Sequence, residues 1–178
     1  MKKVKQPRLD KHWHLATDDH EIELTELEFA LIRVSEAFAR WESDCLACCH
    51  SQVFSGADTA VLHVIRMHDR PKSISEIGRL LNRDDTSNLQ YGVRKLARAG
   101  LIEKSGVADN KKGVTYKVSQ AGLEATDKYG AFRRELLLPL TELIAGKEDL
   151  NAVARVLNLL AGMYDQASCI AATHRAHE

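Results

Sequence analysis

Two long stretches of the chain carry apolar residues at alternating spacings of three and four positions. The first stretch covers residues 25–50, and its stripe consists of Leu27, Leu31, Val34, Phe38, Trp41, Cys45 and Cys48. The second covers residues 150–171 and has a wider apolar face. This spacing is typical of helices that pack against other helices. We therefore expect two long helices that pack together and against a second copy of the chain. Thr25, with Glu28 three positions later, predicts where the first helix begins.

Shorter elements are expected between the two stretches. Asp58 is placed to cap a helix that ends at His68. Ser73, with Glu76 at the third position, predicts the start of a second helix. Its expected buried side consists of Ile74, Ile77, Leu80 and Leu81. After a turn at residues 82–84, a further helix is predicted over residues 85–99, because Gly100 suits the position beyond a helix end.

Two strands are expected next, over residues 101–105 and 114–119, with a polar tip between them. Ser119 is placed to cap a last short helix, in which Gly130 and Pro139 predict bends. The order of elements is that of a winged helix-turn-helix. The predicted fold is mainly α with a small β-hairpin wing, in which this core is flanked by long N- and C-terminal dimerisation helices. The predicted parts are an arm (1–20), a dimerisation helix (21–57), a DNA-binding domain (58–122) and a C-terminal dimerisation region (123–178).

The helix over residues 85–99 has one apolar and one polar face. Leu89, Val93 and Leu96 fall on one side when successive residues are placed 100° apart. The opposite side and its margins carry no acidic residue and consist of Ser87, Asn88, Gln90, Tyr91, Arg94, Lys95 and Arg98. Such side chains donate to phosphates or reach base edges, whereas an ordinary solvated face would include some acidic residues. The pattern indicates a DNA recognition helix.

Three short segments resemble the MarR family of bacterial transcriptional regulators. They are SEIG at 75–78, KLARAGLIE at 95–103 and VSQAG at 118–122. The flanking helices match that family in length, position and apolar pattern. The resemblance implies a homodimer that binds a palindromic operator, with the 85–99 helix in the major groove and the wing in the adjacent minor groove.

The resemblance also extends the set of candidate DNA-binding residues. They are Thr86, Ser87, Asn88, Gln90, Tyr91, Arg94, Lys95, Arg98, Asp109, Lys111 and Lys112. The family's wing commonly carries an Asp followed two residues later by an Arg, whereas this chain has lysines there. Because lysine is a strongly hydrated point charge, we expect the wing to contribute phosphate affinity more than base readout.

The charge distribution agrees with a DNA-facing centre. The formal net charge of the whole chain is zero. Residues 58–119 nevertheless carry +5, residues 15–44 carry −7 and residues 120–178 carry −2. A positive central module between acidic flanks is expected when one lobe faces phosphate. No apolar run is long enough for a membrane span or a signal peptide, and we expect a cytoplasmic protein.

Cys45, Cys48 and Cys49 form a cluster at the end of the first predicted helix. Core packing is the first interpretation, redox sensing the second and metal binding a distant third, because no second ligand pair exists. The MarR resemblance implies control of DNA binding by cysteine oxidation or by a small aromatic effector. No cofactor or metal is expected.

Two other classes of function compete with DNA binding. An enzyme is disfavoured because the sequence has no phosphate-binding glycine loop, no nucleophile elbow and no paired ligand motif. A winged-helix module for protein or RNA contact is the alternative function, since a fold alone does not imply a function. The basic face of the 85–99 helix favours duplex DNA.

Overall fold

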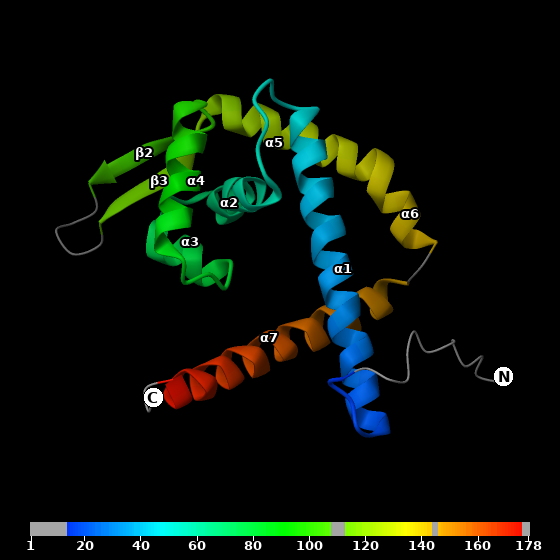
Figure 1. The fold of residues 1–178 in the computed structure, drawn as a ribbon. Coiled ribbons are helices and arrows are strands. Elements are labelled where there is room, and N and C mark those ends of the chain that lie inside the picture. The colour runs from blue at the N-terminus through cyan, green and yellow to red at the C-terminus, as the bar shows by residue number, and fades with distance from the viewer. Residues whose placement is uncertain (1–13, 108–112, 144–145, 176–178) are drawn as a thin grey trace. The chain divides into compact units, whose positions relative to one another are not determined.

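The computed structural model describes residues 14–107, 113–143 and 146–175, and the chain divides into two compact units between Gly130 and Ala131. The helices of the first unit are α1 (Asp19–Ala47), α2 (Gly56–Arg66), α3 (Ile74–Leu80), α4 (Thr86–Arg98) and α5 (Gln120–Phe132), which crosses the boundary. Its strands are β1 (Lys72–Ser73), β2 (Ile102–Val107) and β3 (Val114–Val118), and a 3-10 turn follows α2 (Met67–Asp69). The predicted fold class, mainly α with a small β wing, is confirmed (Figure 1).

The N-cap of the first helix lies seven residues earlier than predicted. Asp18 is its N-cap, and its carboxylate accepts a hydrogen bond from the Glu21 backbone N–H at 2.9 Å. Thr25 lies inside the helix, where its hydroxyl donates to the Glu21 carbonyl at 2.8 Å. The predicted Thr25–Glu28 capping box was therefore wrong. Asp18 accepts a hydrogen bond from a free N–H group of the first turn, and acidic residues in that turn further stabilise the earlier start.

The cap of α2 is Ser55 rather than Asp58. The Asp58 backbone N–H donates to the Ser55 hydroxyl at 3.2 Å, while the Asp58 carboxylate accepts from the Ser55 backbone N–H at 3.1 Å. This reciprocal pair is a complete capping box. Asp58 thus occupies the third helical position, from which its carboxylate also reaches another element.

The small sheet has three strands in the order β1-β3-β2, so the predicted hairpin gains an edge strand that the sequence did not indicate. Lys72 pairs with Tyr116, and Ile102 pairs with Val118, both in antiparallel register. β1 was missed because two residues are too short to show an alternating pattern. The hairpin itself and the positive φ of 74° at Gly100 agree with the prediction.

The core of the first unit forms where α2, α4 and the sheet meet. Its fully buried side chains include Phe54, Leu62, Ile65, Ile77, Leu96 and Leu101. In Figure 1, α2 lies between α1 and α4, and the β2–β3 hairpin extends from the far side of α4. The predicted buried side of α3 is only partly correct. Ile77 is buried, but Leu80 is 40% exposed, because α3 ends there and the chain turns away.

The second unit consists of helices only. A π-helical turn (Arg133–Leu137) leads into α6 (Leu138–Glu142), and α7 covers Lys147–Arg175. Of the two predicted bends, the one at Gly130 does not interrupt the helix, because α5 continues through it to Phe132. Pro139 follows the π turn directly, as expected for a residue that lacks the N–H of a regular α-helix. Within the described residues, no helix is both long and apolar enough to cross a membrane.

Candidate nucleic-acid interface

The turn between α3 and α4 sets the entry of α4 and depends on a glycine. The Arg83 backbone N–H donates to the Gly78 carbonyl at 2.9 Å, and Asn82 adopts a positive φ of 52°. A Cβ atom on Gly78 would lie 2.8 Å from the Arg83 backbone oxygen. The turn therefore closes only with glycine at position 78, and α4 begins directly after it.

The N-terminus of α4 is held by side chains of the turn. Arg83 donates to both carboxylate oxygens of Asp85, at 3.0 and 2.8 Å. Asn88 donates to the same carboxylate at 3.1 Å. Burial of Leu89, Val93 and Leu96 at 0–2% exposure then fixes the rotation of α4 about its axis. The opposite face is left in solvent, and its exposed polar residues are Thr86, Ser87, Asn88, Gln90, Tyr91, Arg94 and Arg98.

Lys95 lies at the edge of this exposed face, in a hollow that Asn88 and Tyr91 also line, and its side chain is directed to α2. Its ammonium donates to Asp58 of α2 at 2.7 Å and lies 5.0 Å from the centre of the Phe54 ring. The side chain is 27% exposed. The sequence placed Lys95 at the margin of the polar face, and helical geometry alone could not show that a buried carboxylate stands opposite it.

A groove of about 490 Å³ lies between α3, α4 and the sheet. Gln90 and Arg94 of α4 line one side. The other lining residues include Ser75, Lys104 and Tyr116, none of which was among the sequence candidates. Strand alternation could have indicated Lys104, but the groove itself exists only because β2 and β3 pair beside α4. Its lining donates hydrogen bonds and carries positive charge, which suits the phosphate backbone.

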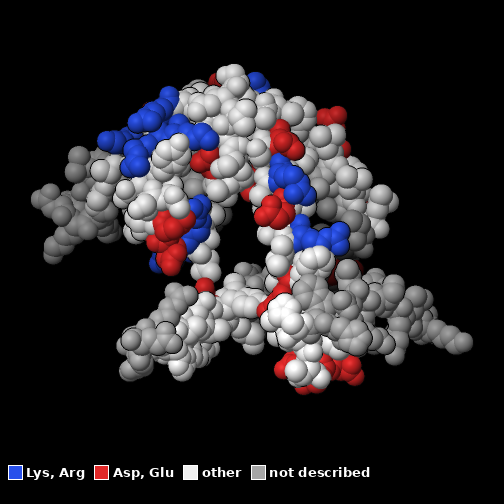
Figure 2. Space-filling model, viewed as in Figure 1, with Lys and Arg blue, Asp and Glu red and all other residues white. Residues whose placement is uncertain are grey.

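Basic side chains gather over α4 in the charge view (Figure 2). α4 itself contributes Arg94 and Arg98, both exposed. The other candidates, Asp109, Lys111 and Lys112, lie outside the described residues. The candidate interface therefore consists of the exposed face of α4 and the adjoining groove, at one face of the first unit.

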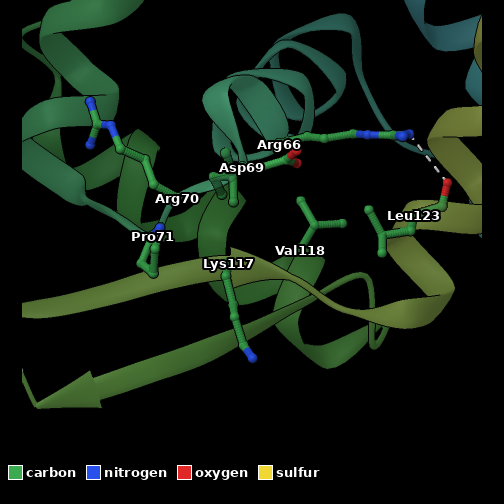
Figure 3. Close-up of a pocket in the computed structure, with 8 residues that line it drawn as sticks. Arg66, Asp69, Arg70, Pro71, Lys117, Val118 and Leu123 are labelled. Carbon is green, nitrogen blue, oxygen red and sulfur yellow. Dashed lines mark hydrogen bonds between the residues drawn. The ribbon is translucent and has the colours of Figure 1, made fainter.

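A smaller cavity of about 170 Å³ lies between α2, the turn that follows it, β3 and α5. Arg66 extends toward α5, where it donates to the Leu123 carbonyl at 3.3 Å (Figure 3). It also donates to Asp127 at 2.6 Å. Arg70 pairs with Glu76, and Lys117 pairs with Glu103 at 3.0 Å. Since these charged groups have partners outside the cavity, the cavity is a packing gap behind the wing.

The three clustered cysteines differ in accessibility. Cys45 is buried, Cys49 is half-buried and Cys48 is exposed. Burial raises the pKa of Cys45 to about 11, and burial together with the neighbouring Cys48 raises the pKa of Cys49. A raised pKa lowers the thiolate fraction and therefore the reactivity. Among the described residues, no group of three or more His, Cys, Asp or Glu side chains is arranged to hold a metal ion.

Comparison with known proteins gives the same architecture. Residues 54–122 match the family model of the winged helix DNA-binding domain. This model describes a DNA-binding domain, in accord with the expectation of a non-enzymatic protein. No curated protein sequence matches the chain.

Several solved structures share the fold. A cysteine-to-serine mutant of MarR from E. coli, complexed with operator DNA, is 18% identical with a TM-score of 0.62, and the match covers 81% of this chain and 99% of that chain. MarR from Staphylococcus aureus, in complex with salicylate and kanamycin, is 14% identical with a TM-score of 0.64 (83% and 95%). The oxidised form of E. coli MarR is 18% identical with a TM-score of 0.55 (75% and 93%). The chain therefore carries a winged helix DNA-binding domain within the fold of the MarR-type regulators.

Proposed function

We propose that the protein is a transcriptional regulator that binds a palindromic operator as a homodimer, probing the major groove with α4. One observation carries this proposal: α4 is held by a buried apolar face, and its solvent face has seven exposed polar residues, none of them acidic. The adjoining groove offers further donors from Ser75, Lys104 and Tyr116. Duplex DNA presents phosphates and base edges that such a surface fits.

A second copy of the chain is proposed as the partner. Large apolar side chains of α1 are exposed, with Ile32 at 61%, Val34 at 62% and Phe38 at 56%. On α7 the exposed apolar residues are Leu150, Val153, Val156, Leu157, Leu159, Met163 and Ile170. Two long helices with so many uncovered apolar groups are typical of chains that associate. Two-fold symmetry of the dimer would match a palindromic site.

Regulation by oxidation or by a small aromatic molecule is part of the proposal. The structure of an oxidised MarR and that of a salicylate complex show these states for relatives of the same fold. In this chain the exposed thiol of Cys48 is the most accessible of the cluster. We propose repression as the mode of action and the cytoplasm as its place, where chromosomal DNA is available.

Selection from a random duplex library tests the proposal. The full chain is incubated with the library, bound duplexes are recovered and sequenced, and the affinity for the most enriched duplex is compared with that for a scrambled duplex by fluorescence anisotropy. We expect an enriched palindrome bound at least about 10³-fold more tightly than the scrambled duplex. An RNA duplex of the same sequence serves as competitor. Equal affinity for both DNA duplexes, or preference for the RNA, would support the alternative function of an RNA or protein module.

A further inference from the structure

We propose that Lys95 is a positioning residue, and that its ion pair with Asp58 holds α4 in the orientation on which DNA sequence preference depends. This inference rests on the proposed function, because it concerns how the same helix is placed for readout. It differs from the sequence prediction, in which Lys95 contacts DNA itself. The contacts of the pair, its burial and its link to α1 support it.

One oxygen of the Asp58 carboxylate, Oδ2, accepts two hydrogen bonds. It completes the capping box of α2 with Ser55 and accepts from Lys95 at 2.7 Å. The Asp58 side chain is only 10% exposed. Burial acts to raise the pKa of Asp58, but the hydrogen bonds from Lys95 and Ser55 outweigh it and lower the pKa. A carboxylate that stays ionised in this way forms a strong, charge-assisted hydrogen bond with the Lys95 ammonium.

The pair also connects α4 to α1. The Lys95 ammonium lies over the ring of Phe54, which is fully buried. The Phe54 carbonyl in turn accepts a hydrogen bond from the Ser43 hydroxyl of α1 at 2.7 Å. A continuous set of contacts therefore runs from α1 through the segment before α2 to the last turn of α4.

Gly92 of α4 faces the Asp58 side chain at close range. A Cβ atom there would lie 3.1 Å from an Asp58 carboxylate oxygen, tighter than most such contacts. Gly92 thus leaves the space in which the Asp58 side chain meets α4. A pair in this position controls the rotation and tilt of α4, and base readout requires donors to be placed to within a fraction of an ångström.

Two substitutions that keep side-chain shape test the role of the pair. Lys95→Met removes the ammonium and Asp58→Asn removes the carboxylate charge while retaining an oxygen for the capping box. Lys95→Arg restores a cation, and Lys128→Met, on the exposed face of α5, is the matched control. Anisotropy with the duplex selected by the wild-type protein and with its scrambled version is measured at several salt concentrations.

We expect Lys95→Met and Asp58→Asn each to weaken binding to the selected duplex about tenfold, with the scrambled duplex changed by less than about twofold. The double variant should bind as tightly as whichever single variant binds more weakly, because both substitutions remove the same interaction. The salt slope of Lys95→Met should equal that of the wild type. Lys95→Arg should recover most of the affinity, and Lys128→Met should bind like the wild type.

A phosphate contact by Lys95 gives a different result. Lys95→Met would then weaken both duplexes and reduce the salt slope by about 0.9, whereas Asp58→Asn would leave binding intact. That result overturns the inference.

Gly92→Ala is a second test that keeps both charges but crowds Asp58. Gly92→Ala should reduce the preference for the selected duplex over the scrambled duplex, while the salt slope stays unchanged. If Gly92→Ala and Asp58→Asn both keep the wild-type preference, the inference is also overturned.

Failure of the proposed function would look different, because the wild-type protein would then select no duplex. Amide hydrogen exchange of α4 without DNA reports on the pair independently of binding. Exchange in α4 should accelerate in Lys95→Met and Asp58→Asn relative to Lys128→Met, since the helix loses its tie to α2. Exchange equal to that of the control would show that the pair does not hold α4.

Discussion

A Cβ atom on Gly122 would lie 2.0 Å from the backbone oxygen of Leu101, so α5 meets the start of β2 at a distance that only glycine permits. The Ser119 backbone N–H donates to the same Leu101 oxygen at 3.1 Å. The Ser119 hydroxyl accepts from the Gly122 backbone N–H at 3.1 Å. These contacts hold the first turn of α5 against Leu101, the residue that precedes β2.

The first prediction is that Gly122→Ala destabilises the fold by about 2–4 kcal/mol, because the added methyl must displace backbone. Helix propensity alone would predict the opposite sign. The free energy of unfolding is measured by urea denaturation. Ala121→Gly, at the exposed neighbouring position, is the control and should cost at most about 1 kcal/mol. A Gly122→Ala variant as stable as the wild type would show that α5 docks more loosely than described.

The second prediction concerns the proposed dimer. Replacing Leu157 and Leu160 of α7 by glutamate should convert the protein to a monomer, because charges cannot be buried unpaired in an apolar interface. Sedimentation velocity at micromolar protein concentration measures the oligomeric state. Asn158→Glu, an exposed polar position of the same helix, should stay dimeric. A wild-type protein that sediments as a monomer contradicts the proposed dimer and removes the reason for a palindromic site.

The third prediction separates base readout from phosphate affinity. Arg94 is exposed on α4 and lines the groove, so Arg94→Ala should cost about 1–3 kcal/mol on the selected duplex and reduce discrimination against the scrambled duplex. Replacing Lys111 and Lys112 by alanine should weaken both duplexes equally and reduce the salt slope by about 0.9 for each phosphate that is no longer neutralised. Titrations of both variants at several salt concentrations measure these effects. The reverse pattern would make the wing the reader of the sequence.

The fourth prediction concerns Glu42, which is 8% exposed and whose pKa burial raises to about 7. Between about pH 4.5 and 7 the folded state holds a proton that the unfolded state has released, so stability falls as the pH rises through this window. Glu42→Gln should remove this dependence and stabilise the fold by roughly 1–3 kcal/mol at pH 8. Urea denaturation at pH 5, 6, 7 and 8 measures it. Glu36→Gln, at an exposed position of α1, is the control, and parallel curves for all three proteins would refute the prediction.

The fifth prediction assigns oxidation sensitivity to Cys48. Its thiol is exposed, whereas burial raises the pKa of Cys45 to about 11 and also raises that of Cys49. Peroxide should therefore weaken binding to the selected duplex in the wild type and in Cys45→Ser, but not in Cys48→Ser. Cys169→Ser, another exposed cysteine, is the control. If the wild-type protein binds DNA equally well after peroxide treatment, cysteine oxidation is not the signal.

The sequence by itself determined the order of elements and the polar face of α4. Periodicity and capping residues act over three or four positions, so α3, α4, the Gly100 stop and the β2–β3 pairing were all predicted correctly. The limits of local patterns appear where two candidate caps compete, as with Ser55 and Asp58, and where a strand is too short to alternate, as with β1. The reciprocal Ser55–Asp58 hydrogen bonds decide the first case, and β1 forms because it pairs with β3, a segment far away in the sequence.

Tertiary structure decided which polar side chains face solvent. Lys95 and Arg94 are neighbours in sequence with the same charge, yet Lys95 is tied to Asp58, 37 positions away, while Arg94 is exposed. Lys104 and Tyr116 join Arg94 in the groove only because the sheet forms beside α4. Helical periodicity places a residue on a face of the helix, but the residue that it contacts comes from another segment. That contacting residue determines whether a charged side chain is free to bind DNA or holds the helix in place.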